Sequence, residues 1–146
     1  MTTYEKSQAL SDAGIKFPES DFVYVDCLKN DFKREPRIIG RAYLGALRMY
    51  ANQHLSVDFC YPFLCDAPSM EDLWERLPKS VSVTEKGYPT QYVLKQEKYI
   101  ALNETKVGYY SEITSHFHLD IFSNTNPCNA LADLLLWCKS KGHLNN

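Results

Sequence analysis

The stretch that most constrains the fold lies at residues 126–142, which read NPCNALADLLLWCKSKG. Asn126 followed by Pro127 is typical of a helix start, because an asparagine side chain accepts bonds from free backbone N–H groups and proline fits the first turn. Gly142 is typical of the position just after a helix end, where left-handed backbone is favoured. Apolar residues recur between these ends at helical spacing, at Leu131, Leu134, Leu135 and Cys138. A helix this apolar must be covered on most sides, so the rest of the chain has to supply a sheet or further helices.

The region before this helix, residues 81–123, changes to a two-residue period. Short strand candidates follow one another through it, at 81–84, 90–96, 98–103, 107–113 and 117–122. Successive strands joined by short turns form an antiparallel meander. We therefore predict an α+β fold with an antiparallel β-meander of about four to six strands, helices packed on one face of it and a C-terminal helix over 126–142.

The first half of the chain is less regular. Its patterns predict a charged loop over 29–37, strands over 22–25 and 55–61, and helices over 4–13, 36–52 and 69–77. A chain of 146 residues can bury one core, and no change in composition marks a boundary. We therefore expect a single α+β domain over residues 1–146.

Basic residues gather around the predicted helix over 36–52. At 100° per residue, Arg37, Arg41 and Arg48 fall within about 40° of one another on its polar side. Arginine forks suit phosphate and carboxylate groups, so this stripe is a hypothetical site for a nucleotide, RNA or an acidic partner. The alternative is a solvated helix face that nearby acidic residues partly neutralise.

The strand candidate over 117–122 and the residue before it hold the sharpest candidate for chemistry. In a strand, alternation places His116, His118 and Asp120 on one face. Two imidazoles and a carboxylate would suit a divalent metal such as Zn²⁺, or acid–base catalysis in a hydrolase. The alternative is that these three residues simply face water. In both cases the apolar face, expected under the C-terminal helix, consists of Phe117, Leu119 and Ile121. No other cofactor is expected.

Tyrosine is unusually frequent, with ten residues in the chain. Tyrosines are enriched at protein interfaces because they combine a large apolar body with a polar tip. Tyr109 and Tyr110 are therefore candidate binding residues on an aromatic surface. The alternative is strand propensity, which enriches tyrosine in any sheet.

Charge and composition argue against several classes of protein. A net charge of −2 gives the whole chain no electrostatic reason to bind nucleic acid. No apolar run approaches the ~20 residues of a membrane span, and the N-terminus lacks the apolar core of a signal peptide. The five cysteines are odd in number and scattered, which indicates reduced thiols in a cytoplasmic protein.

Several segments in the second half also carry a resemblance. They read SMEDLWERLPK at 69–79, FSNTNP at 122–127, ALADLLLW at 130–137 and KGHL at 141–144, and KSQAL at 6–10 precedes a Gly-Ile pair near the N-terminus. In these segments the chain resembles small uncharacterised proteins encoded by phages and integrated elements of gut Bacteroidetes. The resemblance covers about residues 1–15 and 69–144. It implies a phage or prophage origin and a small α+β fold, and it carries over no catalytic residue.

No phosphate-binding glycine loop, nucleophile elbow or zinc-protease motif is present in the sequence. The first functional hypothesis is therefore a small phage- or prophage-type accessory protein that binds a macromolecular partner, foremost another protein. The alternatives are a metal- or histidine-dependent hydrolase using His116, His118 and Asp120, and nucleotide or RNA binding through the arginine stripe.

Overall fold

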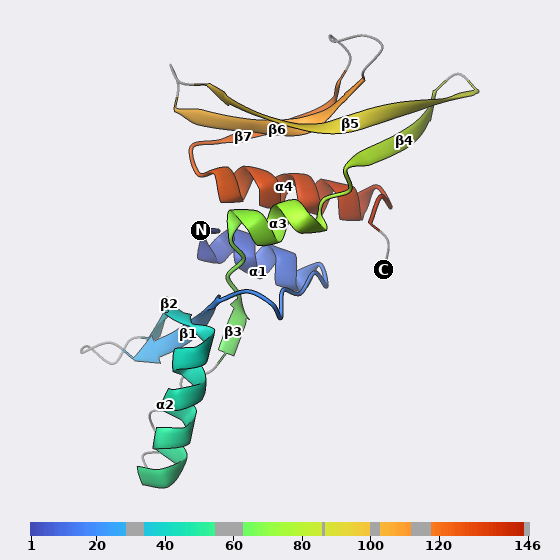
Figure 1. Cartoon of the computed structure of the whole chain (residues 1–146). Helices are drawn as coiled ribbons and strands as arrows, with labels where there is room; N and C mark the ends of the chain where they lie inside the picture. Colours follow the sequence, from blue (N-terminus) through green and yellow to red (C-terminus); the bar gives the residue numbers. More distant parts are fainter. Residues whose placement is uncertain (29–33, 55–62, 86, 100–102, 112–117, 145–146) are drawn as a thin grey trace. The chain divides into compact units, whose positions relative to one another are not determined.

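The computed structural model describes the whole chain except residues 29–33, 55–62, 86, 100–102, 112–117 and 145–146 (Figure 1). The chain divides into two compact units. One unit is Thr2–Ser69, and the other is Met70–Asn146 together with Met1. The first unit contains a three-stranded sheet and the second a four-stranded sheet. The predicted α+β class is confirmed, while the prediction of one domain stays a prediction.

The unit Thr2–Ser69 is built on an antiparallel sheet with the strand order β2-β1-β3. Its strands are β1 (Phe22–Leu28), β2 (Arg34–Gly40) and β3 (Phe63–Asp66), and its helices are α1 (Tyr4–Asp12) and α2 (Arg41–His54). Val23, Val25 and Leu44 form a buried cluster against which Ile39 packs, so α2 reaches one face of the sheet through Leu44.

The predicted helix over 36–52 is wrong at its start, because residues 34–40 form strand β2 and α2 begins only at Arg41. The whole of β2 pairs with β1, from Phe22 opposite Gly40 to Leu28 opposite Arg34. Two adjacent β-branched residues, Ile38 and Ile39, favour a strand there. The helical pattern of the sequence therefore holds only for the second part of the segment.

The unit Met70–Asn146 contains the predicted meander. Its strands pair in chain order and always antiparallel: β4 (Ser80–Glu85), β5 (Tyr88–Tyr99), β6 (Glu104–Ser111) and β7 (His118–Asn124). The predicted strand over 90–96 and the start of the one predicted over 98–103 are one strand, β5, because pairing with β6 continues through Glu97 opposite Lys106 to Tyr99 opposite Glu104. Residues 100–102 of the second prediction lie outside the described residues.

The predicted C-terminal helix is also confirmed, as α4 (Pro127–Ser140). The Asn126 side chain caps it by accepting from the backbone N–H groups of Cys128 and Asn129. Gly142 follows the helix with φ 75°, which a residue with a side chain rarely adopts. Figure 1 shows α4 lying along one face of the four-stranded sheet. Its apolar side is fully covered, as required, at Ala130, Leu131, Ala132, Leu134, Leu135 and Cys138.

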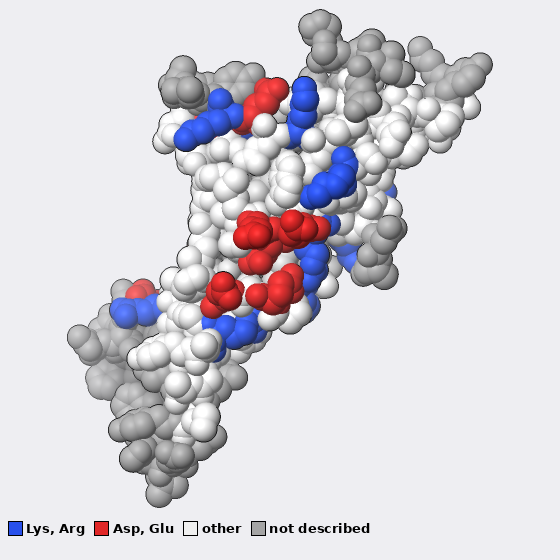
Figure 2. Space-filling model, viewed as in Figure 1, with Lys and Arg blue, Asp and Glu red and all other residues white. Residues whose placement is uncertain are grey.

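A second helix, α3 (Met70–Arg76), packs against α4. Its first turn carries Glu71 and Asp72, and acidic side chains gather over this helix in Figure 2. Negative charge stabilises the positive end of a helix dipole, so these residues have a local structural role. No helix among the described residues is long and apolar enough to cross a membrane.

Strand β7 contains a bulge that changes its alternation. Tyr110 pairs with His118 and Gly108 with Ile121, so β7 uses one more residue than β6 between these two pairs. Phe122 consequently pairs with the fully buried Val107. Because paired residues lie on the same face, Phe122 is on the helix side and Ile121 is on the other. The expectation that Ile121 lies under the helix is therefore wrong, and the inserted residue is the reason.

Candidate functional site

An open groove of about 770 Å³ lies at the C-terminal end of α4. It is bordered by both edge strands of the four-stranded sheet and by the end of the helix. The lining residues are Ser82, Val83 and Thr84 from β4, Leu119, Asp120 and Ile121 from β7, and Trp137, Lys141 and His143. A flat sheet would hold its first and fourth strands ~14 Å apart, at roughly 4.8 Å for each step. Here the two edge strands share one groove.

The edges of β4 and β7 matter because each strand pairs on one side only among the described strands. A strand edge without a neighbour offers backbone N–H and C=O groups in a regular row, which is a template for a further strand. The groove is therefore bordered by the two strands that have such an edge and by side chains from the end of α4.

The side chains at the end of α4 form a compact cluster. The Trp137 and His143 rings lie 5.3 Å apart between centroids. Lys141 lies one helical turn after Trp137, on the same side of the helix, and its backbone N–H bonds to the Trp137 carbonyl at 3.0 Å. The turn at Gly142 lets the His143 N–H bond back to the Cys138 carbonyl at 2.8 Å. We call Trp137, Lys141 and His143 the α4 donor cluster.

The indole of Trp137 has an unusual feature. Its Nε1 atom is buried and has no hydrogen-bond partner in the part of the chain that the structure describes. Leaving such a donor without an acceptor costs about 1–3 kcal/mol. Because this nitrogen is closed to solvent, an acceptor from outside the chain can reach it only if the indole turns toward the groove.

The ring of Tyr109 packs against this indole and supports it. Its ring stacks on that of Trp137 with centroids 6.1 Å apart. Its hydroxyl donates to the Pro78 carbonyl at 2.7 Å, and the Cys138 thiol donates to the same hydroxyl at 3.5 Å. Burial, followed by the contact with Cys138, raises the pKa of Tyr109 far above its ordinary value, so the hydroxyl stays protonated.

The structure does not bring Tyr109 and Tyr110 together on one surface. Tyr109 is fully buried, whereas Tyr110 is partly exposed and its ring lies 5.7 Å from the Lys95 ammonium. Successive strand residues point to opposite faces, so only one of the two can face outward. Tyr109 acts as a support for Trp137, a residue that the tyrosine pattern did not indicate.

Of the predicted metal ligands, only Asp120 has a described side chain. His116 lies outside the described residues, and of His118 only the backbone pairing with Tyr110 is described. Asp120 is exposed and lines the groove. In the described part of the chain, no group of three or more His, Cys, Asp or Glu side chains is placed to hold a metal. The metal hypothesis therefore stays a prediction.

The groove also brings a hydroxyl, an imidazole and a carboxylate together, in Ser82, His143 and Asp120. A nucleophile–base–acid arrangement needs its members within hydrogen-bond reach. Asp120 belongs to the predicted trio, but His143 enters through the turn after α4, which the strand pattern could not indicate.

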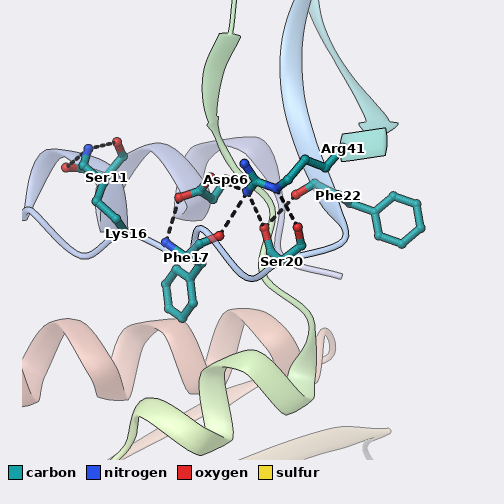
Figure 3. A network of polar contacts seen from close by, with 7 residues as sticks. All are labelled: Ser11, Lys16, Phe17, Ser20, Phe22, Arg41 and Asp66. Atoms are coloured by element: carbon teal, nitrogen blue, oxygen red, sulfur yellow. Dashed lines mark hydrogen bonds and ion pairs between the residues drawn. The ribbon is translucent and has the colours of Figure 1, made fainter. Parts of the chain in front are cut away.

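The arginine stripe is divided between two elements. Arg37 lies on β2 and Arg41 begins α2, while the side chain of Arg48 lies outside the described residues. The Arg41 guanidinium is bonded within its own unit (Figure 3). It pairs with Asp66 at 2.7 Å and also donates to the Phe17 carbonyl at 3.0 Å.

Ser20 and Asp66 complete this network. Ser20 accepts from Arg41 through its carbonyl at 2.8 Å and its hydroxyl at 3.0 Å. The second carboxylate oxygen of Asp66 accepts from the Phe17 N–H at 2.7 Å. Arg41 thus joins the start of α2, the 17–20 turn and β3, and its main bonds are structural.

No protein-family model, curated protein or solved structure matches the chain. Its function must therefore be inferred from the groove and the side chains around it.

Proposed function

We propose that this chain is a non-enzymatic binding protein that holds an extended segment of a protein partner along the edges of β4 and β7. The observation that carries the proposal is the groove bordered by both edge strands of one sheet. An extended peptide that adds to a sheet edge gains main-chain hydrogen bonds, and pockets for alternate side chains give specificity.

The buried indole supports the same proposal. A bound segment carries a hydrogen-bond acceptor at every peptide group. One acceptor that meets Trp137 Nε1 after the indole turns toward the groove would remove the cost of the bare donor. The free protein has this cost and the complex does not, so the difference contributes directly to affinity.

A phage or prophage origin and a cytoplasmic location belong to the same proposal. The resemblance over about residues 1–15 and 69–144 supports the origin. The location is supported by Cys65, Cys128 and Cys138, which are free thiols buried within the structure. Buried reduced thiols fit a reducing compartment.

A hydrolase is the second candidate function, favoured by the presence of Asp120, His143 and Ser82 in one groove. However, no hydrogen bond joins these three side chains in the described part of the structure. Metal analysis of the purified protein, with phosphoesterase and esterase assays before and after added Zn²⁺ or Mn²⁺, tests this candidate. We expect no bound metal. We also expect no hydrolytic activity that the wild-type protein has and the Asp120→Ala variant lacks.

The proposed function is tested by selection of peptides from a random 12-residue display library on the folded protein. Thr84→Tyr places a bulky side chain at the groove while keeping a residue that favours strands. Gln96→Tyr is the matched control, because Gln96 is exposed on β5 and does not line the groove.

We expect the selected peptides to bind the wild-type protein and the Gln96→Tyr variant equally, and to lose binding to Thr84→Tyr. Circular dichroism of the two variants checks that both sheets are intact. Peptides that bind all three proteins alike, or a selection that enriches none, would contradict the proposal.

A further inference from the structure

We infer that the segment held in the groove presents a carboxylate side chain, from Asp or Glu, to the α4 donor cluster of Trp137, Lys141 and His143. This inference rests on the proposed function and names the chemistry that the groove selects. It follows from the hydrogen-bonding groups that the cluster offers, from their lack of acceptors, and from the charges around them.

The cluster is dominated by N–H donors. The Trp137 indole is a donor only, and the Lys141 ammonium has three donors and no acceptor. The His143 ring adds a nitrogen donor within 5.3 Å of the indole, measured between ring centroids. All three residues line the groove from the same end of α4. Such a set requires a ligand group rich in acceptors.

The donors are not satisfied within the described part of the chain. Trp137 Nε1 is buried without an acceptor, and the exposed Lys141 has no ion pair among the described residues. Lys139 and Lys141 are close in sequence, but only Lys141 borders the groove. A cation without a partner beside a buried bare donor favours an anionic acceptor.

A carboxylate meets these requirements better than a peptide or side-chain amide. It accepts through two oxygens and donates nothing, whereas an amide would turn its own N–H groups toward some of the donors. Bonds from N–H groups to an ionised carboxylate are also shorter and about twice as strong as neutral ones. The groove should therefore discriminate Asp from Asn and Glu from Gln.

Two negative features lie near the cluster. The carbonyl end of α4 repels an anion, but the Trp137, Cys138 and Lys139 carbonyls already accept from the N–H groups of residues 141–143. Asp120 is the second feature, and it borders the groove from β7. It disfavours a carboxylate on the β7 side, so the acid of the ligand is directed to the helix side.

The fluorescence of Trp137 reports binding at the groove. The chain has two tryptophans, so Trp74→Phe leaves Trp137 as the only one. The peptides used are those from the display selection that lose binding to Thr84→Tyr. Each is synthesised in two forms, one with its Asp or Glu residues and one with Asn or Gln in their place. Fluorescence titration with each pair then measures affinity and shows whether the indole environment changes.

We expect the amide peptides to bind about tenfold more weakly than the acidic peptides, as expected for loss of a charge-assisted bond. Lys141→Gln should weaken binding of the acidic peptide by a similar factor and leave the amide peptide almost unchanged. Lys139→Gln is the matched control, because it removes the same charge from α4 away from the groove, and it should change neither titration. Trp137→Phe, followed by calorimetry, should weaken both peptides.

The outcomes separate the two proposals. Groove-dependent peptides without any enrichment of Asp or Glu, or pairs with equal affinity, would overturn the carboxylate inference and leave the strand-binding function standing. A selection that yields no groove-dependent peptide would overturn both. Self-association of the wild-type protein in sedimentation experiments, lost in Thr84→Tyr, would identify a second copy as the occupant and would also overturn the inference.

Discussion

The two units of this chain differ in what their polar side chains bond to. In Thr2–Ser69, charged and hydroxyl side chains bond mainly to the backbone of their own unit, as Arg41 and Asp66 do around the 17–20 turn. In Met70–Asn146, an apolar helix covers a sheet, and the exposed Lys141 ammonium at its end has no ion pair among the described residues. Each unit also holds one buried polar side-chain atom without a partner in the described part of the chain, Ser7 Oγ in Thr2–Ser69 and Trp137 Nε1 in Met70–Asn146. Bonded polar groups stabilise a structure, whereas an unpaired cation beside a groove is available for a ligand.

Further contacts in Thr2–Ser69 follow the same rule. The Thr2 hydroxyl donates to the Pro68 carbonyl at 2.7 Å, across 66 residues of sequence. The Tyr24 hydroxyl donates to the Thr2 carbonyl at 2.7 Å. Both ends of this unit are thus tied by side chain–backbone bonds. By comparison, we expect the stability of Met70–Asn146 to depend mainly on apolar packing around α4.

The largest effect is expected from a cavity under α4. Leu134 is fully buried, and Leu134→Ala should lower the free energy of unfolding by about 3–5 kcal/mol, through lost burial and the cavity that remains. Urea unfolding followed by tryptophan fluorescence measures it, because both tryptophans, Trp74 and Trp137, lie in this unit. Leu136→Ala is the control, since Leu136 is only partly buried and should cost clearly less. Equal losses would show that the buried side of α4 contributes no more to stability than its partly buried side.

The next effect concerns the polar network of Thr2–Ser69. Asp66→Ala removes the carboxylate that accepts from Arg41 and from the Phe17 N–H, and should cost about 2–3 kcal/mol. Hydrogen–deuterium exchange resolved by peptide should place the largest loss of protection in strands β1–β3. Glu35→Ala is the control: the Arg37–Glu35 pair is 3.8 Å long and exposed, and its loss should cost under about 0.5 kcal/mol. A loss of protection centred on β4–β7 would contradict this assignment.

The local parts of the fold could be predicted from the sequence. The ends of α4 depend on residues next to the helix, Asn126, Pro127 and Gly142, so their chemistry is readable without the structure. The meander follows from strand patterns with short turns between them. In contrast, β2 depends on pairing with β1, and the bulge in β7 depends on its register with β6. Neither leaves a periodic signal within its own segment.

The candidate site was predictable only in fragments. Asp120 was among the predicted site residues, but it shares its groove with Trp137, Lys141 and His143, which come from a helix end that the sequence indicates as structural. Likewise the sequence predicts Arg41 as a binding residue and does not show its ion pair with Asp66, which lies 25 positions away. The sequence alone does not show which charged groups have a partner in the fold, because such partners can lie far apart along the chain.

A third prediction uses pH to compare the two units. Burial, and then the neighbouring Asp66 charge, raises the pKa of the Cys65 thiol from 9.0 to about 11. The folded state therefore holds this proton more tightly than the unfolded state. The resulting stability is complete below about pH 9 and is lost as the pH rises toward 11, by on the order of 2 kcal/mol.

Urea unfolding at pH 8 and at pH 10.5, for wild type and Cys65→Ala, measures this loss. We expect the variant to lose less stability than the wild type between the two pH values. Cys138→Ala is the comparison in Met70–Asn146, where burial raises the pKa of the Cys138 thiol but the hydrogen bond with Tyr109 opposes the shift. Cys138→Ala should therefore change the loss of stability between pH 8 and pH 10.5 by less than Cys65→Ala does. The reverse order would show that the hydrogen bond with Tyr109 does not oppose the effect of burial on the Cys138 pKa.

The smallest effect on stability is expected at the groove itself. Trp137→Phe keeps an aromatic ring on Tyr109 but removes the buried Nε1–H, which has no acceptor among the described residues. The lost ring area destabilises the fold and the removed bare donor stabilises it, so the free energy of unfolding should change by less than about 1 kcal/mol. Tyr109→Phe is the contrasting variant, because it leaves the Pro78 carbonyl without its donor and should cost about 1–2 kcal/mol. Chemical unfolding followed by circular dichroism measures both. If Trp137→Phe proved the more costly of the two, the indole N–H would have an acceptor inside the protein, and the end of α4 would have no bare indole donor for a ligand.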